Sequence, residues 1–354
     1  MNIAILGFGL MGQKRAKALA RHPRGRVCAV FDVDERRPAA LQQQLGYEIC
    51  ASAETLIARS DVDVVVVAVP HYLTRDLAVA ALEGGKHVFC EKPVGRTARE
   101  CDEILATAER CGRELGVGFN FRHYPGVAEA YRVIQRGDLG EPTHLRCVLG
   151  HAARPGYDRE WKTSKQLCGG GCLLDPGIHV IDLIRFLLGS IQNGSATLFR
   201  SFWNLEIEDN VFLTLQTVSG KQALAHISIT EWRNQFALDI FGTEGCLKIQ
   251  GRSGYYGSQS IQFTKRWSWL SEERVRQEWS RDYGPDDLSL GTELELFLSR
   301  VAGGNVPELA TPADARAALD LIGKFYESSE IVDVGETYVE LASGAAHRSG
   351  PSPI

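Results

Sequence analysis

The chain has 354 residues, of which 44% are hydrophobic and 23% charged, and its formal net charge is −5 at pH 7. This length accommodates two domains, and the composition is that of an ordinary soluble globular protein. The small negative charge gives no electrostatic case for nucleic acid or an anionic membrane as partner, and no apolar run reaches the roughly 20 residues of a membrane span. Nine scattered cysteines without an N-terminal export signal favour reduced thiols and a cytoplasmic location.

The first residues are typical of a dinucleotide-binding site. Residues 3–6 indicate a short buried strand, residues 13–20 a helix, and between them stand three glycines in G-x-G-x-x-G spacing, Gly7, Gly9 and Gly12. The first glycine permits a tight turn, the second lets the backbone approach a pyrophosphate, and the third lets helix and strand pack closely. The acidic residue expected about 20 positions later is Asp32, which closes the apolar run 27–31.

Strand and helix patterns then alternate up to residue 119. We expect helices at 35–45, 55–59, 74–83 and 97–111, and strands at 62–69, 86–90 and 114–119. This alternation predicts an α/β fold with a doubly wound parallel sheet, whose ligands bind outside the carboxyl ends of the strands. The polar segments at such strand ends are Asp32, Pro70-His71, Glu91-Lys92-Pro93 and Asn120.

From about residue 121 the pattern changes. A helix is expected at 127–136, a strand at 142–152, a helix at 175–188, and further helices at 288–302 and 312–330. The remaining β runs are 195–203, 210–218, 222–232, 235–241, 245–250 and 258–265. Consecutive strands predict an α+β domain with a large, mostly antiparallel open sheet. We therefore expect a dinucleotide-binding domain at 1–120, a substrate-binding and oligomerisation domain at 121–342, and a loose tail at 343–354.

A second informative segment runs from Gly169 to Asp182. In helical spacing, Asp175, His179 and Asp182 fall on one face at i, i+4 and i+7. Pro176 fits the first turn of a helix and Asp175 its N-cap. Two interpretations are open here: Asp175 is only a cap and His179 an interior histidine, or both belong to an active site.

The chemistry of alcohol oxidation favours the active-site interpretation. A nicotinamide enzyme needs a group that accepts the hydroxyl proton as hydride leaves, and histidine is suited to this task. One turn into a helix, His179 would meet the positive end of the dipole, which favours the neutral base. Lys92 could bind the same oxygen and stabilise the developing alkoxide, with Asp175 as orienter and relay. These three residues are the predicted catalytic group.

A zinc site is the rival interpretation of the same segment. Cys168, Cys172, Asp175 and His179 could be combined into the site of a metal-dependent alcohol dehydrogenase. The Cys-x-x-x-Cys spacing is not a standard pair, however, and no second cysteine cluster closes a structural site. We therefore expect no metal.

Residues 1–330 resemble the glucose-fructose oxidoreductase, inositol dehydrogenase and rhizopine-catabolism (Gfo/Idh/MocA) family. The matching pieces are Gly7–Gly12, Glu91-Lys92-Pro93 and Gly169–Asp182, in the family's order and spacing. The resemblance implies a Rossmann domain followed by an α/β domain whose open sheet builds homodimers or homotetramers. It also implies that Lys92, Asp175 and His179 are catalytic and that Pro93 follows a cis peptide.

On the cofactor side, the resemblance implies contacts around the adenosine, the pyrophosphate and the nicotinamide ribose. The family usually has Asn where this chain has His71. The implied residues are Gly7, Phe8, Gly9, Leu10, Met11, Gly12, Asp32, Ala68, Val69, Pro70, His71, Glu91, Lys92, Pro93 and Asn120.

The middle of the chain is most similar to family members from polysaccharide and nucleotide-sugar pathways, in segments 156–162, 202–210 and 230–233. Some such relatives act on activated sugars in antibiotic biosynthesis. Aromatic faces pack against sugar C–H surfaces, while cations can hold phosphate. The candidates for the sugar pocket beside the catalytic group are Trp161, Lys162, Arg233, Tyr255 and Tyr256.

The carboxylate at the end of the second strand indicates which nicotinamide is used. Asp32 can accept both hydroxyls of the adenosine ribose and would repel a 2′-phosphate, a repulsion that Arg36 and Arg37 partly offset. We therefore predict an NAD-dependent dehydrogenase acting on a secondary hydroxyl of a sugar, in particular a nucleotide-activated one. The alternatives are an inositol-like cyclitol or free-sugar dehydrogenase, and a non-catalytic NAD-binding sensor or scaffold.

Overall fold

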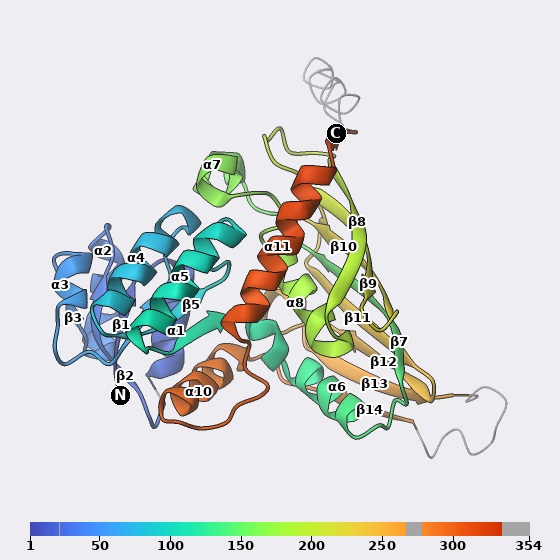
Figure 1. Cartoon of the computed structure of the whole chain (residues 1–354), viewed down its shortest axis with the longest axis horizontal. Helices are drawn as coiled ribbons and strands as arrows, with labels where there is room; N and C mark the ends of the chain where they lie inside the picture. Colours follow the sequence, from blue (N-terminus) through green and yellow to red (C-terminus); the bar gives the residue numbers. More distant parts are fainter. Residues whose placement is uncertain (21, 267–277, 335–354) are drawn as a thin grey trace, which may run out of the picture.

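The computed structural model describes residues 1–20, 22–266 and 278–334, with Tyr255 described only in its backbone. Two sheets lie on opposite sides of the molecule, with helices between them (Figure 1). The first is a six-stranded parallel sheet in the order β3-β2-β1-β4-β5-β6. Its strands are β1 (Asn2–Leu6), β2 (Arg26–Phe31), β3 (Glu48–Ile49), β4 (Val64–Val67), β5 (His87–Glu91) and β6 (Leu115–Gly118).

Helices cover both faces of this parallel sheet, as the alternating pattern predicts. All four residues of β4 are buried, which explains its continuous run of valines. One face packs on α1 and α10, and the other on α4 and α5. The helices are α1 (Leu10–Leu19), α2 (Arg36–Leu45), α3 (Ala53–Ile57), α4 (His71–Glu83), α5 (Ala98–Cys111) and, from far along the chain, α10 (Ser289–Val301).

The second sheet has nine strands in the order β14-β13-β12-β11-β7-β10-β9-β8-β15. Its pairings are antiparallel except for the parallel pairs β7·β10 and β8·β15, so the sheet is mixed and mostly antiparallel. The strands are β7 (Pro142–Gly150), β8 (Ile191–Arg200), β9 (Asn210–Thr217), β10 (Gln222–Ser228), β11 (Gln235–Gly242), β12 (Gly245–Gln250), β13 (Ser260–Lys265), β14 (Trp279–Asp282) and β15 (Ile331–Asp333).

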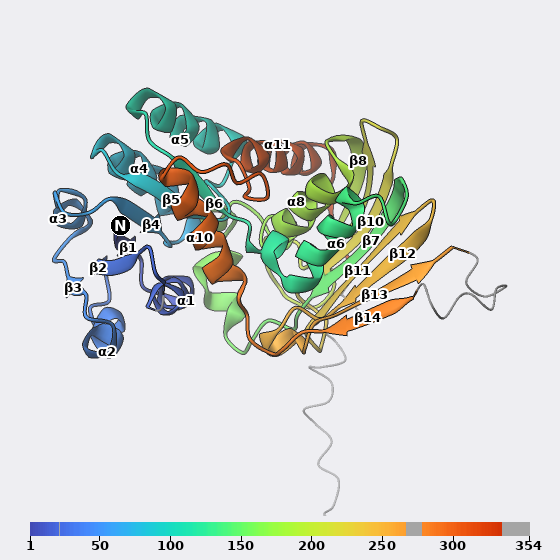
Figure 2. The same ribbon diagram turned by 90° about the horizontal axis from the view of Figure 1, so that it is seen from below.

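One face of the large sheet packs on helices, whereas the other carries none in the described part of the chain (Figure 2). The covering helices are α6 (Pro125–Gln135), α8 (Gly177–Leu188) and α11 (Pro312–Ser328). Strand β10 shows the resulting alternation, because Ala223, Ala225 and Ile227 are buried while Leu224 is 53% exposed. Within the described residues, no helix combines the length and apolar character needed to cross a membrane.

Several local predictions differ from the structure. Helix α8 begins at Gly177 after Pro176 as N-cap, and no side chain caps it, so the prediction of Asp175 as cap is wrong. Consequently Asp175 lies outside the helix and does not share the i, i+4, i+7 face. The strand expected at 195–203 is β8, at 191–200, and the short strands β3, β14 and β15 were not predicted. The expected tail at 343–354 lies outside the described residues.

Candidate active site

A cavity of about 720 Å³ opens at the carboxyl ends of the parallel strands and is lined by residues of both halves of the chain. Three predicted cofactor residues, Phe8, Gly12 and Pro93, do not line it; Phe8 is fully buried in the core beneath. The predicted cofactor residues that do line it are Gly7, Gly9, Leu10, Met11, Asp32, Ala68, Val69, Pro70, His71, Glu91, Lys92 and Asn120.

The glycine loop has the geometry of a pyrophosphate cradle. Gly7 adopts a φ of +86°, and a Cβ there would overlap Ala68 O; a Cβ on Gly12 would overlap Gly7 O. A Cβ on Gly9, in contrast, would meet no atom within 4 Å, so the loop leaves open space at this position. Helix α1 begins directly after Gly9 and has no side-chain cap. Its first N–H groups are therefore free to bind a diphosphate.

Asp32 is held in place by the backbone around it. Its Oδ2 accepts a hydrogen bond from Phe8 N at 2.6 Å, and its Oδ1 accepts one from Asp34 N at 2.9 Å. Arg37 Nη1 also lies 3.4 Å from Oδ1, whereas Arg36 turns to Asp34. Each carboxylate oxygen accepts about two hydrogen bonds, so Oδ2 retains capacity for a ribose hydroxyl.

Glu91 belongs to a buried ion network that the sequence did not reveal. Arg15, fully buried in α1, donates to Glu91 Oε1 and to Glu293 Oε2, both at 2.6 Å. Burial raises the pKa of Glu293 to about 8 even though Arg15 opposes this shift. The network joins α1, β5 and α10, and Asn120 strengthens the same junction by donating to Ser289 Oγ at 2.8 Å.

Asp175 binds two lysines across the cavity. Lys92, after β5, pairs with Asp175 Oδ1, and Lys162 donates to Oδ2 at 2.7 Å. Burial alone would raise the pKa of Asp175, but Lys162 and Lys92 outweigh it and hold the pKa well below the usual range. The same attraction raises the pKa of Lys162. The peptide bond between Lys92 and Pro93 is cis, as the resemblance implies.

His179 is a buried, neutral imidazole that faces the same cavity. Its ring stacks on Phe121 with a centroid separation of 3.9 Å, and its Nδ1 has no hydrogen-bond partner among the described residues. Burial, followed by the charges of Lys92 and Arg252, holds its pKa well below the ordinary value. A buried ring nitrogen without a hydrogen-bond partner is uncommon in a histidine with a purely structural role. The lowered pKa favours the unprotonated imidazole, which is the form that accepts a proton.

Asp182 has a different role from its predicted neighbours. Its carboxylate accepts from Arg122 Nε at 2.8 Å and from Arg122 Nη2 at 2.5 Å, and Asp314 lies 3.1 Å from the same guanidinium. This buried cluster ties α8 to α11 and takes no part in lining the cavity.

The glycines before Asp175 are required by close packing. A Cβ on Gly170 would overlap the Tyr326 hydroxyl, and one on Gly171 would overlap Glu208 O. Glu208 Oε1 accepts from Leu173 N at 2.9 Å and from Tyr326 OH at 2.7 Å. The loop before β9, which carries Glu208, and helix α11, which carries Tyr326, thus fix the segment that carries Asp175.

Only some of the residues predicted for the sugar pocket line the cavity. Trp161, Lys162 and Tyr256 line the cavity, whereas Arg233 is exposed and absent from its lining. The side chain of Tyr255 lies outside the described residues. His71 is fixed by its Nδ1, 2.8 Å from Cys168 O, and burial lowers its pKa to about 4. Lining residues that the sequence analysis missed include Phe121, Tyr124, His151 and Arg252.

The cysteines of the zinc alternative do not converge. Cys172 Sγ donates to Ile227 O, while Cys168 Sγ lies 3.4 Å from His71 Nδ1. Burial raises the pKa of both thiols, and all nine cysteines are unpaired. The described residues contain no group of three or more His, Cys, Asp or Glu placed to hold a metal ion.

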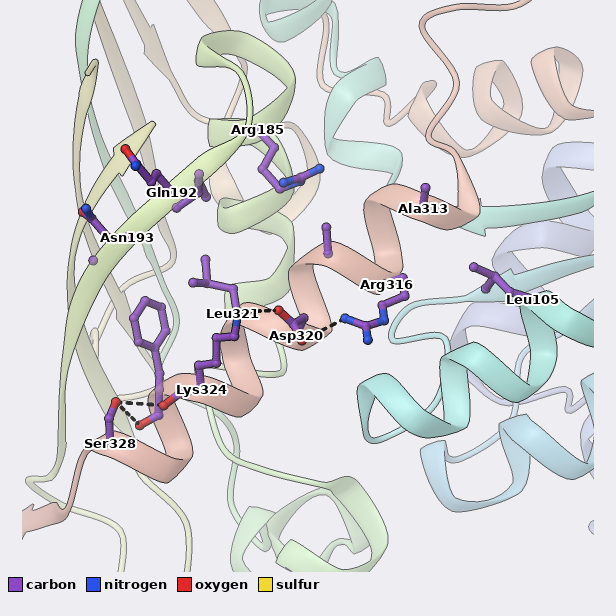
Figure 3. Close-up of a pocket in the computed structure, with 14 residues that line it drawn as sticks. Leu105, Arg185, Gln192, Asn193, Ala313, Arg316, Asp320, Leu321, Lys324 and Ser328 are labelled. Carbon is purple, nitrogen blue, oxygen red and sulfur yellow. Dashed lines mark hydrogen bonds and ion pairs between the residues drawn. The ribbon is translucent and has the colours of Figure 1, made fainter. Parts of the chain in front are cut away.

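A second cavity of about 570 Å³ lies between α11 and β8 (Figure 3). None of the predicted catalytic or cofactor residues lines it. Its exposed cations are neutralised locally, since Arg316 and Lys324 both pair with Asp320 at 2.8 Å. The glycine-loop cavity is therefore the candidate active site.

Comparison with known proteins finds relatives among sugar oxidoreductases. Over 285 residues the chain is 30% identical to levoglucosan dehydrogenase of Pseudarthrobacter phenanthrenivorans, covering 70% of this chain and 73% of that protein. Over 189 residues it is 38% identical to a protein of Amycolatopsis mediterranei provisionally named as a UDP-kanosamine synthase oxidoreductase subunit, covering 52% and 51%. A solved levoglucosan dehydrogenase with NADH and levoglucosan superimposes with a TM-score of 0.81 at 22% identity, covering 93% and 96%.

Two family descriptions match most of the chain. Residues 1–119 match the oxidoreductase family with an NAD-binding Rossmann fold, and residues 127–248 match the GFO/IDH/MocA C-terminal domain. The first match contains the strands of the parallel sheet, and the second contains β7 to β11 and most of β12 of the large sheet. The protein belongs to the Gfo/Idh/MocA family of NAD-binding oxidoreductases.

Proposed function

We propose that this protein is an NAD-dependent dehydrogenase that transfers hydride between nicotinamide and a secondary alcohol carbon of a sugar, with nucleotide-linked sugars as the substrate class. The observation that carries the proposal is the meeting of Lys92, Asp175 and neutral His179 in the cavity that begins at the glycine loop. A sensor or scaffold would have no need for a base and a cation beside the nicotinamide end of such a cavity.

Each residue has a defined task in this proposal. The glycine loop and the N-terminus of α1 hold the diphosphate, and Asp32 holds the adenosine ribose; bound NAD supplies the hydride acceptor. His179 accepts the hydroxyl proton of the substrate, and Lys92 stabilises negative charge on the same oxygen. Asp175 fixes the Lys92 ammonium by their ion pair. In the reverse direction, protonated His179 returns the proton to the oxygen.

Two relatives support different substrates. The name of the Amycolatopsis mediterranei protein refers to a UDP-linked sugar, which supports the nucleotide-sugar proposal. Levoglucosan dehydrogenase, similar over a longer segment, supports a second candidate, an enzyme of neutral or anhydro sugars. The cavity itself contains aromatic faces, Trp161 and Tyr256, that suit a sugar ring in either case.

A substrate panel tests the proposal. Purified protein is mixed with NAD and with nucleotide sugars, sugar phosphates, neutral sugars, anhydro sugars or cyclitols, and NADH formation is followed by absorbance. Preferred turnover of a nucleotide sugar supports the main proposal. Preference for a neutral sugar or cyclitol selects the second candidate, and NAD binding without turnover of any compound would favour a sensor.

The open face of the large sheet supports the proposal that the protein is a homodimer or homotetramer. Phe212 and Leu224, 51% and 53% exposed, stand on neighbouring strands of this face, and Phe212 stacks on His226. Exposed apolar surface of this kind is typical of an interface with a second copy. Light scattering after gel filtration tests it, and a monomer at micromolar concentration contradicts it.

A further inference from the structure

Arg252 is a half-buried cation with no acidic partner among the described residues. It follows β12 and lines the candidate active site beside Phe121 and Tyr124. Its Nη1 donates to Tyr124 OH at 2.7 Å, and its Cζ lies 3.6 Å from the ring centre of Tyr256. Its Nε is buried and has no hydrogen-bond partner among the described residues. The guanidinium is thus held by aromatic groups, with part of its donor capacity unused.

Two buried arginines, Arg15 and Arg122, show which partner Arg252 lacks. Arg15 binds two carboxylates, and Arg122 binds Asp182 and Asp314. Within the described chain, no carboxylate forms an ion pair with Arg252. Removing a cation from water costs several kcal/mol unless an anion compensates. A site that keeps such a cation is therefore complementary to an anion that comes with a ligand.

The neighbouring half-buried cations already have an acidic partner. Lys92 and Lys162 share Asp175, and at the rim Arg154 pairs with Glu160 at 2.6 Å. Asp287 also lines the cavity, and its Oδ1 accepts from Ser289 N at 3.0 Å and Ser289 Oγ at 2.5 Å. Of the lining cations that are at least half-buried, Lys92, Lys162 and Arg252, only Arg252 has no ionic partner among the described residues; Lys14 also has none there but is exposed.

The backbone that presents Arg252 is held in an unusual conformation. The next residue, Ser253, is buried and has a φ of +71° and a ψ of 171°, a region that residues other than glycine rarely adopt. Ser253 N donates to Gly257 O at 2.8 Å, and Gln259 Nε2 donates to Gly251 O at 3.2 Å. Strain of this kind persists where the surroundings impose it, which is frequent at ligand sites.

We propose that Arg252 binds a phosphoryl oxygen of the substrate, so that the sugar oxidised here carries a phosphate or a diphosphate. This inference rests on the proposed dehydrogenase function and adds the residue that recognises the phosphoryl group of its substrate. The planar guanidinium offers several N–H donors in a fixed fork that matches phosphate oxygens. Arg252 takes the role that the sequence analysis gave to Arg233, which is exposed and lies outside the cavity lining.

The test measures binding, so that it does not depend on turnover. NADH-saturated protein, whose dinucleotide site is filled, is titrated with UDP, with glucose 6-phosphate and with glucose by calorimetry. If UDP binds most tightly, the phosphoryl group that Arg252 contacts belongs to a diphosphate-linked sugar. If glucose 6-phosphate binds most tightly, it belongs to a sugar monophosphate. Both support the proposal, whereas affinities for UDP and glucose 6-phosphate no greater than that for glucose would overturn it.

Variants then assign the effect to the side chain. Arg252→Gln should weaken binding of the phosphorylated ligand by about 10- to 100-fold, as for the loss of one charge-assisted bond, and leave NADH binding unchanged. Arg252→Lys keeps the charge and loses the guanidinium fork, so its affinity for the phosphorylated ligand should lie between those of the wild type and Arg252→Gln. This variant also tests the proposal if Arg252→Gln does not fold. Arg281→Gln is the matched control, because Arg281 also stacks on a ring, Trp279, but lies outside the cavity.

The possible outcomes distinguish a failure of the phosphoryl site from a failure of the proposed dehydrogenase function. A nucleotide sugar that is oxidised with an unchanged KM in Arg252→Gln keeps the dehydrogenase and overturns the phosphoryl site. A protein that oxidises no compound in the panel, but loses UDP or glucose 6-phosphate affinity in Arg252→Gln, keeps the phosphoryl site and refutes the dehydrogenase. An equal loss for phosphorylated and neutral ligands would show a merely structural role and overturn the proposal.

Discussion

The imidazole of His179 fixes how activity should depend on pH. Burial, and then the charges of Lys92 and Arg252, place its pKa well below the ordinary value of 6.5. A general base acts only when unprotonated, so kcat/KM for alcohol oxidation should fall as the pH drops through this pKa. We predict that the acid limb of the profile lies well below pH 6.5, and that removing a nearby cation moves it upward.

The structure gives the size of that movement for Arg252→Gln. The His179 ring centre lies 3.9 Å and Arg252 Cζ lies 4.7 Å from the ring centre of Phe121. The two charges are therefore no more than about 9 Å apart, where they interact by about 1.8 kcal/mol at an effective dielectric constant of about 20. This energy corresponds to a rise of the acid limb by about one pH unit. The other charged groups that act on His179 are Lys92, Asp175 and Arg15.

Initial rates of NADH formation between pH 4.5 and pH 9 provide the measurement (roughly two units either side of an ordinary histidine). The substrate should be a neutral member of the panel, so that neither its own titration nor the loss of a phosphoryl contact enters the profile. Arg281→Gln is the control and should leave the limb in place. A wild-type limb at or above pH 6.5, or a limb that does not move in Arg252→Gln, would refute His179 as the base in this environment.

Three further variants test separate parts of the site. His179→Ala should lower turnover by about 10²- to 10⁴-fold with NADH affinity retained in a fluorescence titration, and unchanged turnover would remove His179 from the mechanism. Asp32→Ser should reduce kcat/KM with NAD by at least about tenfold and raise the relative use of NADP, because charge-assisted ribose bonds are lost; equal losses with both cofactors would contradict this. Arg122→Met should lower the free energy of unfolding in urea by about 3–5 kcal/mol, and Arg122→Met with Asp182→Leu should recover much of that loss.

Most of what the sequence could predict about the fold and the site came from short local motifs. The glycine loop, Asp32 and the Glu91–Pro93 turn are each encoded within a few residues, and the βαβ rhythm places all three at strand ends. The sugar-facing side of the cavity was less predictable, because it is assembled by long-range contacts. Arg252 reaches Tyr124 from 128 positions away, and no local pattern distinguishes it from a solvated arginine.

The segment before α8 shows where helical spacing misled the prediction. Regular i, i+4 spacing assumed that the helix already includes Asp175, whereas it begins at Gly177. Asp175 pairs with Lys92 and Lys162, whereas Asp182 pairs with Arg122 outside the cavity lining. The residue types were identified correctly as polar groups of interest, but their partners depend on tertiary packing that spacing alone does not contain.

The ion pair between Lys92 and Asp175 joins the two halves of the molecule. Lys92 follows β5 of the parallel sheet, whereas Asp175 belongs to the glycine segment held by Glu208 and Tyr326 in the second half. The position of the Lys92 ammonium is therefore set by both halves of the chain. Lys162 binds the second carboxylate oxygen of Asp175, so a rotation of this side chain would leave both lysines without their acidic partner. The ion pair that orients Lys92 therefore also fixes one half of the chain against the other.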